Sequence, residues 1–250
     1  MANNKSFYKI NDILSLFLKK NKWTLTNISK ELKIPKSTVF SILNTLIETS
    51  FLEKEDNYYM IGMKILRLSN VIRSEDKIRN IIVPELNRLQ EQVNETINLT
   101  RIYEKRAIYI ECLHSSHPIR PQSSIGITAP LYCTGVGKAL LAFQNDKYIK
   151  DYLDKVKLER HTETTITNRE KFLEEVKTIR EEGYANDRSE YEAGVRCISV
   201  PIKADEDRVE YAVSIAGIMD RMTPEAINKY LPLLIKTKKI IEGKLKDFWY

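Results

Sequence analysis

The sequence has little of the residue types that mark several other protein classes. Its 250 residues include only three cysteines and three histidines, and no run of about 18 apolar residues occurs. The cysteines (Cys112, Cys133 and Cys197) are far apart, and neither they nor the histidines have metal-ligand spacing. These absences exclude a disulfide framework and predict no metal, no cofactor and no membrane span. With no apolar leader stretch near its start, the chain is expected to be cytoplasmic.

Charge is distributed unevenly along the chain. Residues 1–75 contain 12 Lys and Arg against 7 Asp and Glu, whereas residues 76–250 contain 28 against 27. A basic segment joined to a nearly neutral one indicates a polyanionic partner for the first segment, although lysine-rich solubility is an alternative. The length and a hydrophobic content of 42% suit one small and one medium domain.

Apolar residues at helical spacing predict three short helices before residue 50. The first has an apolar stripe at Ile10, Ile13, Leu14 and Phe17. We expect the second to begin near Thr26 as N-cap, and the third at Pro35, since proline is favoured at the first helical position. Residues 51–54 and 58–61 then predict two short strands around a polar turn. This order is typical of a winged helix-turn-helix.

The side of the third helix opposite its apolar residues has short polar side chains. Hydroxyl and amide groups near a helix N-terminus can reach phosphates and base edges in a major groove. A small helical domain with a solvated polar face is the alternative, and we favour DNA binding. The predicted DNA-binding residues are Thr26, Lys36, Ser37, Thr38, Ser41 and Asn44.

Residues 63–93 have a helical pattern that is interrupted at 73–76. This connector leads us to predict a DNA-binding domain over 1–67, followed by a linker helix and a second domain over 68–250. A two-fold dimer would present two recognition helices to a palindromic site. A connector that serves only as a covalent spacer is the alternative.

The remainder of the chain mixes strand pairs with helices. Alternation predicts strands over 95–101, 106–113, 195–203 and 209–217, and helical spacing predicts helices over 137–144, 147–158, 168–182 and 224–248. Adjacent strand pairs favour an antiparallel sheet flanked by helices, so the fold class is α+β.

Two segments suggest a ligand site. In residues 129–139 glycines precede a helix, where backbone N–H groups can approach an anion. A nucleotide loop is excluded because Tyr132 and Ala139 occupy positions that need Gly and Ser or Thr, so a small carboxylate fits better. A tight turn without ligand is the alternative. The late strand pair has a stripe of small residues (Cys197, Ser199, Ala212, Ser214 and Ala216), which leaves space for a ligand or admits a closely packed helix.

Motifs along the whole chain resemble those of IclR-type transcriptional regulators. In the first third the similarity lies in residues 32–39, in Leu43, Thr45 and Leu46, and in residues 59–62. In the second part it lies in residues 130–142, 164–167, 183–187 with Glu190, 194–198 and 214–217. One position departs: where many members have Arg, this chain has Ser41, so an operator preference cannot be transferred.

The resemblance implies a GAF-like C-terminal domain that binds small organic acids, in a regulator that forms a homodimer or homotetramer. We expect a repressor, and an activator is the alternative. It implies that backbone groups of Gly135 and Val136 receive the effector carboxylate. The other implied effector-binding residues are Leu131, Asp187, Cys197, Ser214 and Ala216. Some members have a second Ser where this chain has Ala216, which favours a less oxygenated or bulkier effector.

These observations predict a one-component regulator of double-stranded DNA. Effector binding would change the assembly and with it the spacing of the recognition helices, and the coupling must be reciprocal. One alternative is a DNA-binding protein whose second domain only oligomerises. An enzyme using Asp187 with Glu190, or Cys197 with a histidine, is disfavoured because no nucleophile–base signature is present.

Overall fold

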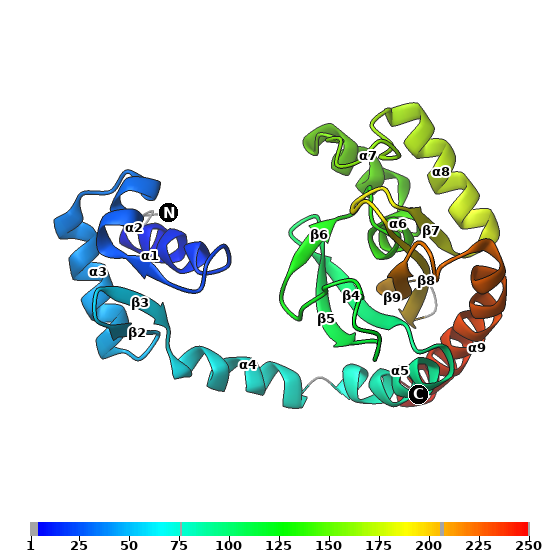
Figure 1. Cartoon of the computed structure of the whole chain (residues 1–250), viewed down its shortest axis with the longest axis horizontal. Coiled ribbons are helices and arrows are strands. Elements are labelled where there is room, and N and C mark those ends of the chain that lie inside the picture. The colour runs from blue at the N-terminus through cyan, green and yellow to red at the C-terminus, as the bar shows by residue number, and fades with distance from the viewer. Residues whose placement is uncertain (1–4, 76, 206–207, 250) are drawn as a thin grey trace. The chain divides into compact units, whose positions relative to one another are not determined.

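The chain forms two compact units, Met1–Lys77 and Ile78–Tyr250, in a computed structural model that describes residues 5–75, 77–205 and 208–249 (Figure 1). The predicted domain boundary after residue 67 falls inside helix α4 (Met63–Glu75), ten residues before this division. None of the described helices has the length and apolarity needed to cross a membrane.

The first unit is a winged helix-turn-helix, as predicted. Helices α1 (Lys5–Leu16), α2 (Leu25–Leu32) and α3 (Lys36–Glu48) pack with a three-stranded sheet of order β1-β3-β2, made of β1 (Trp23–Thr24), β2 (Leu52–Glu55) and β3 (Tyr58–Ile61). Their buried apolar residues form one cluster, which includes Ile13, Ile28, Val39, Leu43 and Leu52. The sequence pattern did not indicate β1, because a two-residue strand shows no alternation.

Two predicted helix starts in this unit were wrong. The N-cap of α2 is Thr24, whose hydroxyl accepts a hydrogen bond from the Asn27 N–H, and Thr26 is the second residue of the helix. Thr24 is extended because it pairs with Tyr58 in the sheet, which leaves it where an N-cap must lie. Pro35 is the N-cap residue of α3 and not its first helical residue, with φ −54 and ψ 139.

The second unit contains a six-stranded sheet in which every pair is antiparallel, which confirms the predicted α+β class. Its order is β6-β5-β4-β9-β8-β7. The strands are β4 (Thr96–Tyr103), β5 (Arg106–Leu113), β6 (Thr128–Pro130), β7 (Ala185–Arg188), β8 (Val195–Asp205) and β9 (Arg208–Ile218). The two edge strands, β6 and β7, were not predicted.

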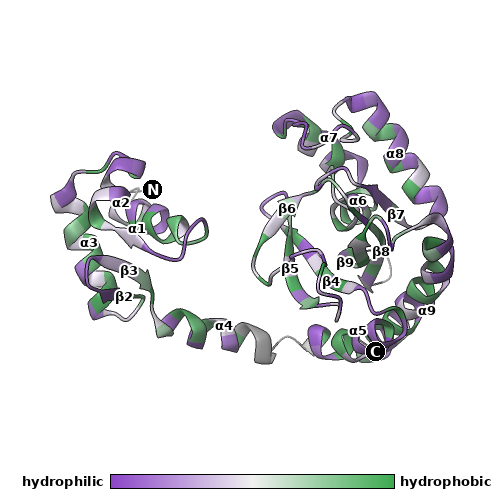
Figure 2. Ribbon diagram, viewed as in Figure 1, coloured by the Kyte–Doolittle hydropathy of each residue, from purple (hydrophilic) through white to green (hydrophobic). Residues whose placement is uncertain are grey.

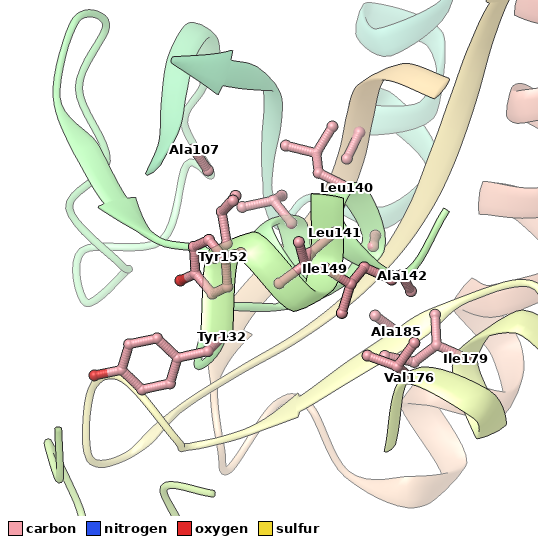
Figure 3. Packing of buried hydrophobic residues seen from close by; sticks show 14 of the residues in the cluster. Ala107, Tyr132, Leu140, Leu141, Ala142, Ile149, Tyr152, Val176, Ile179 and Ala185 are labelled. Atoms are coloured by element: carbon pink, nitrogen blue, oxygen red, sulfur yellow. The ribbon is translucent and has the colours of Figure 1, made fainter. Parts of the chain in front are cut away.

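Helices cover both faces of this sheet. On one face α5 (Lys77–Val93) and α9 (Pro224–Trp249) bury a cluster that includes Leu86, Leu99, Val213, Ile215 and Ile241. On the other face α6 (Gly135–Ala142), α7 (Asp146–Lys155) and α8 (Arg169–Glu182) form a second cluster around Leu140, Tyr152 and Val176 (Figure 3). Alternate strand residues therefore face the two helical layers, as the period of two requires.

The helices differ in how much of their surface is polar. Figure 2 shows purple and green segments alternating along α8, whereas α6 is largely green. All eight residues of α6 are buried. The predicted helix over 137–144 begins two residues earlier, at Gly135, because Thr134 provides the N-cap.

Candidate functional site

Helix α3 presents one polar side to solvent. Val39, Leu43 and Leu46 are buried on the opposite side. Of the predicted DNA-binding residues, Lys36, Ser37 and Ser41 are exposed, Thr38 and Asn44 are half-buried on α3, and Thr26 is half-buried on α2. The structure thus brings four of these side chains together on the solvent side of α3. We call this surface the α3 outer face (Lys36, Ser37, Ser41 and Asn44).

The start of α3 has unused hydrogen-bond donors. Pro35 makes no side-chain cap, and among the described residues no side chain accepts from the first N–H groups of the helix. An uncapped helix N-terminus attracts anions through its N–H groups and its dipole. Lys36 adds a positive charge at the same end. The arrangement can therefore hold a phosphate while the side chains beyond it reach base edges.

The second candidate site lies where α6 meets the sheet. The Thr134 hydroxyl donates to the Pro130 carbonyl (2.7 Å) and accepts from the Gly137 N–H (3.1 Å), which starts the helix there. A Cβ added at Gly135 would lie 2.6 Å from both Cys197 Sγ and Ser199 Oγ. Glycine is thus required for the helix N-terminus to approach the small side chains of β8.

A cavity of about 260 Å³ opens beside this helix start. We call it the effector pocket, and it contains five of the predicted effector-binding residues: Val136, Asp187, Cys197, Ser214 and Ala216. Leu131 is fully buried in the hydrophobic cluster around α6, and Gly135 lies against β8, so neither is in the pocket wall. Their roles in effector binding stay predictions.

Sequence reasoning missed the polar side chains that β4, β5 and the following loop bring to the pocket. Asn98 is opposite Ser214 in the sheet, and its amide donates to the Ser214 hydroxyl (3.3 Å). The Ser123 hydroxyl donates to the Asn98 side-chain oxygen (2.6 Å). Tyr109 also lines the pocket, and burial raises the pKa of its hydroxyl. The alternation predicted over 95–101 is the one sequence signal from which the side of Asn98 could have been inferred.

Asp187 is the buried acid of the pocket, with 5% of its surface exposed. Its carboxylate accepts from the Glu190 N–H (2.8 Å) and from the Cys197 thiol (3.8 Å). Burial raises the pKa of Asp187 to about 7, against the lowering effect of the Glu190 N–H. A substantial fraction of this carboxyl is therefore neutral near pH 7.

No Lys, Arg or His is among the described residues that line the effector pocket. A second acid, Glu192, lies at the pocket and is exposed to solvent. A ligand carboxylate would consequently be held by neutral hydrogen-bond donors and not by an ion pair. The partial neutrality of Asp187 removes part of the repulsion that such a ligand would otherwise meet.

A fully buried lysine, Lys138, binds Glu190, whose N–H donates to Asp187 of the pocket. Lys138 Nζ on α6 binds Glu190 Oε1 (2.5 Å), Glu175 Oε1 (2.7 Å) and the Asn186 carbonyl (2.7 Å). Burial acts to lower the pKa of Lys138, but the two glutamates outweigh it and raise the pKa. Glu190 is thus occupied as an ion-pair partner, which explains the Asp187 and Glu190 pair without catalysis. Among the described residues no cluster of metal-ligating side chains occurs.

Comparison with known proteins identifies the family. Residues 9–56 match the IclR helix-turn-helix domain, and residues 71–242 match the bacterial transcriptional regulator IclR C-terminal domain. The chain belongs to the IclR family. It is 30% identical over 243 residues to the HTH-type transcriptional regulator KdgR of Escherichia coli (strain K12), covering 96% of this chain and 92% of that protein.

Solved structures agree in fold over nearly the whole chain. The IclR structure of Thermotoga maritima superposes with a TM-score of 0.77 at 30% identity, covering 96% of this chain and 98% of that one. An IclR homologue of Microbacterium hydrocarbonoxydans, complexed with 4-hydroxybenzoate, superposes with a TM-score of 0.85 at 21% identity, covering 97% and 100%. This member of the IclR family is a DNA-binding transcriptional regulator and not an enzyme.

Proposed function

We propose that this IclR-family protein represses transcription by placing the α3 outer face in the major groove of an operator. We also propose that a small carboxylate in the effector pocket changes its affinity for DNA. The observation that supports the first point is the exposed polar side of α3, opposite a fully buried apolar side and next to an uncapped helix start. A helix packed in this way can be offered to DNA without disturbing the core.

The proposed DNA contacts divide by chemistry. Lys36 and the first N–H groups of α3 bind phosphate, and Thr26 and Thr38 add hydroxyl contacts to the backbone of the DNA. Ser37, Ser41 and Asn44 reach base edges. The division follows from position, because Lys36 lies at the uncapped end of the helix and Asn44 lies two turns further along it.

The proposed effector contacts come from four elements, α6, β7, β8 and β9. The Val136 N–H at the start of α6 and the hydroxyl of Ser214 bind the carboxylate, while Asp187 and Cys197 bind its other polar atoms. Ala216 leaves room for a bulky group. Leu131 and Gly135 do not line the pocket, and they act on the effector by fixing the start of α6, where Leu131 lies against Gly137 and Gly135 lies against β8. The fold neighbour's ligand, 4-hydroxybenzoate, has a carboxylate and a hydroxyl at opposite ends of an apolar ring, which is the chemistry expected here.

We infer that the protein acts as a homodimer or homotetramer in the cytoplasm. Helix α4 exposes four large apolar side chains (Met63, Leu66, Leu68 and Val71), and exposed apolar surface of this kind favours contact with a second copy. Two copies would present two recognition helices to a palindromic operator.

The test measures DNA and effector binding with the same full-length protein. Labelled random-sequence duplexes should bind at low salt, with an affinity that falls steeply as salt rises. In a panel of small acids that includes 4-hydroxybenzoate, at least one should raise the Tm by an amount that grows with its concentration, and it should also change the duplex affinity.

Each alternative predicts a different result. Absence of duplex binding at low salt contradicts the DNA-binding role of α3. An acid that raises the Tm and leaves duplex affinity unchanged contradicts the coupling. If no acid in the panel raises the Tm, the interpretation in which the second domain only oligomerises is favoured.

A further inference from the structure

The winged helix-turn-helix of this chain has no arginine. The first arginine in the sequence is Arg67, in α4, after the wing. The positive charge of the preceding residues comes from lysine alone. This matters because arginine is the side chain that most often reads guanine, through two parallel hydrogen bonds to O6 and N7, and lysine lacks that rigid geometry.

The wing does not supply a replacement. The turn between β2 and β3 is Asp56 and Asn57, and Glu55 before it is paired with Lys22 (2.8 Å). Lys54 is the only basic residue of the wing strands. Guanine-specific recognition by an arginine is therefore absent from both parts of the described unit that could enter a groove.

An exposed aromatic side chain interrupts the α3 outer face. Phe40 is 49% exposed and belongs to no part of the buried cluster of this unit. It lies one helical turn after Lys36 and one turn before Asn44, with Ser41 next to it. Positions four apart share a side of a helix, so Phe40 and Asn44 meet the same stretch of a groove.

The polar side chains of this face are free for a partner. The Asn44 amide and the hydroxyls of Ser37 and Ser41 make no side-chain hydrogen bond within the described residues. An asparagine amide forms two hydrogen bonds with the N6 and N7 edge of adenine, and a phenylalanine contacts the C5 methyl group of thymine. Both side chains therefore match the A·T pair, and neither matches G·C.

We propose that the operator of this protein has A·T-rich half-site cores, in which Phe40 packs on a thymine methyl group and Asn44 hydrogen-bonds an adenine. The inference rests on the proposed function of α3 and adds the sequence class that it reads. A serine hydroxyl can donate or accept a hydrogen bond and therefore fits either base pair, so Ser37 and Ser41 do not oppose this preference. Lys36, at the uncapped end of the helix, is assigned to phosphate.

The size of the effect follows from one methyl group. Burial of a methyl group contributes about 0.8 kcal/mol, or roughly a fourfold change in affinity. Replacing the contacted thymine by deoxyuridine removes that methyl group and leaves base pairing intact. The Asn44 contact is larger, and its loss should reduce discrimination against G·C at one position by about tenfold.

The experiment selects preferred duplexes from a randomised library with the full-length protein, and then scans the selected site with single deoxyuridine substitutions. We expect A·T-rich half-sites and at least one thymine per half-site whose substitution weakens wild-type binding about fourfold. Phe40→Ala should lose that sensitivity, and Phe40→Leu should keep part of it. Leu18→Ala, which truncates another exposed apolar residue of the same unit, should leave the scan unchanged. Thermal melting shows that each variant is folded.

The outcomes separate this inference from the proposed function. Selection of G·C-rich cores overturns the inference, although salt-dependent duplex binding would leave the function of α3 in place. The Phe40 contact is contradicted if no deoxyuridine substitution in an A·T-rich site weakens binding. It is also contradicted if the Phe40→Ala variant gives the same substitution scan as the wild type. If no duplex is bound at low salt, the proposed function itself is contradicted.

Discussion

Helices α3 and α6 each begin at a candidate binding site, but they are built in opposite ways. In α3 only one side is buried, through Val39, Leu43 and Leu46. In α6 every residue is buried, Lys138 included. A half-exposed helix can change its outer face without touching the core. A fully enclosed helix cannot, so its site and its stability depend on the same contacts.

Removal of the buried lysine of α6 is expected to have the largest effect on stability. Lys138→Met leaves Glu190 and Glu175 without their lysine partner inside the protein. Because an unpaired buried charge is strongly unfavourable, we expect the free energy of unfolding to fall by about 3–5 kcal/mol, measured by urea denaturation.

Two further variants make this result interpretable. Lys150→Met, at an exposed position of α7, should change the free energy of unfolding by less than about 0.5 kcal/mol. Adding Glu190→Gln to Lys138→Met should recover part of the loss. A loss below about 1 kcal/mol in Lys138→Met would show that the network is not needed for stability.

The second test measures how stability depends on pH through Asp187, the buried acid of the effector pocket. The pKa of Asp187 is about 7 in the folded chain against an ordinary 3.8, so the folded state retains its proton between these values. Stability from this group is greatest below pH 4 and is lost as the pH rises through about 7. An asparagine side chain cannot titrate, so Asp187→Asn should gain stability over wild type by an amount on the order of 3 kcal/mol between about pH 5 and pH 8.

Thermal or urea unfolding at several pH values measures that difference. The asparagine oxygen can still accept the Glu190 N–H, so the loop that holds this acid keeps its hydrogen bond. A stability difference that stays constant across the pH range would show that Asp187 is ionised in the folded protein throughout.

The third test adds one carbon atom to α6. A Cβ at Gly137 would lie 2.5 Å from the Leu131 Cα and 2.7 Å from its carbonyl oxygen, which are backbone atoms. We expect Gly137→Ala to lower the free energy of unfolding by about 1–3 kcal/mol in urea denaturation. Gly243→Ala, in open space on α9, should raise it by about 0.5–1 kcal/mol. Equal effects at the two glycines would contradict the enclosure of α6.

The smallest effect on stability is expected on the outer face of α3. Lys36→Ala should change the free energy of unfolding by less than about 0.5 kcal/mol. It should weaken binding to all duplexes alike and reduce the slope of log affinity against log salt by about one, since one phosphate contact is lost. Fluorescence anisotropy over a salt series measures the change in binding, and urea denaturation measures the change in stability. A large loss of stability would remove the contrast with α6.

Elements with a clear period were predictable from the sequence. The polar side of α3 follows from helical spacing, and the pairs β4–β5 and β8–β9 follow from alternation over eight or more residues. Alternation in the late strand pair also placed Cys197 and Ser214 in one stripe, and the resemblance to the IclR family added Asp187, which no spacing connects with them. The short strands β6 and β7 escaped prediction because three or four residues show no period, and their pairing partners are distant in the sequence.

Predictions from local residue types were wrong for the helix starts at Thr26 and Pro35, and they did not include Asn98 or the buried Lys138. Thr26 and Thr24 are equally good N-caps by type, and pairing of Thr24 with Tyr58 decides between them. Asn98 reaches the pocket only through its register with Ser214, 116 residues later. A lysine in a helix is normally expected at the surface, so nothing near Lys138 in the sequence indicated its burial.

The sequence by itself determined the winged helix-turn-helix, the α+β class of the second domain and the outward side of α3, because repeating apolar spacing encodes which side of each element is buried. Only the tertiary structure decided how the effector pocket is made. Its walls come from strands β4 to β9, the loops before β6 and after β7, and the start of α6. Next to it, Lys138 pairs with Glu175 and Glu190 across 37 and 52 residues of chain. Such long-range pairings depend on how the sheet and helices pack, which no local pattern specifies.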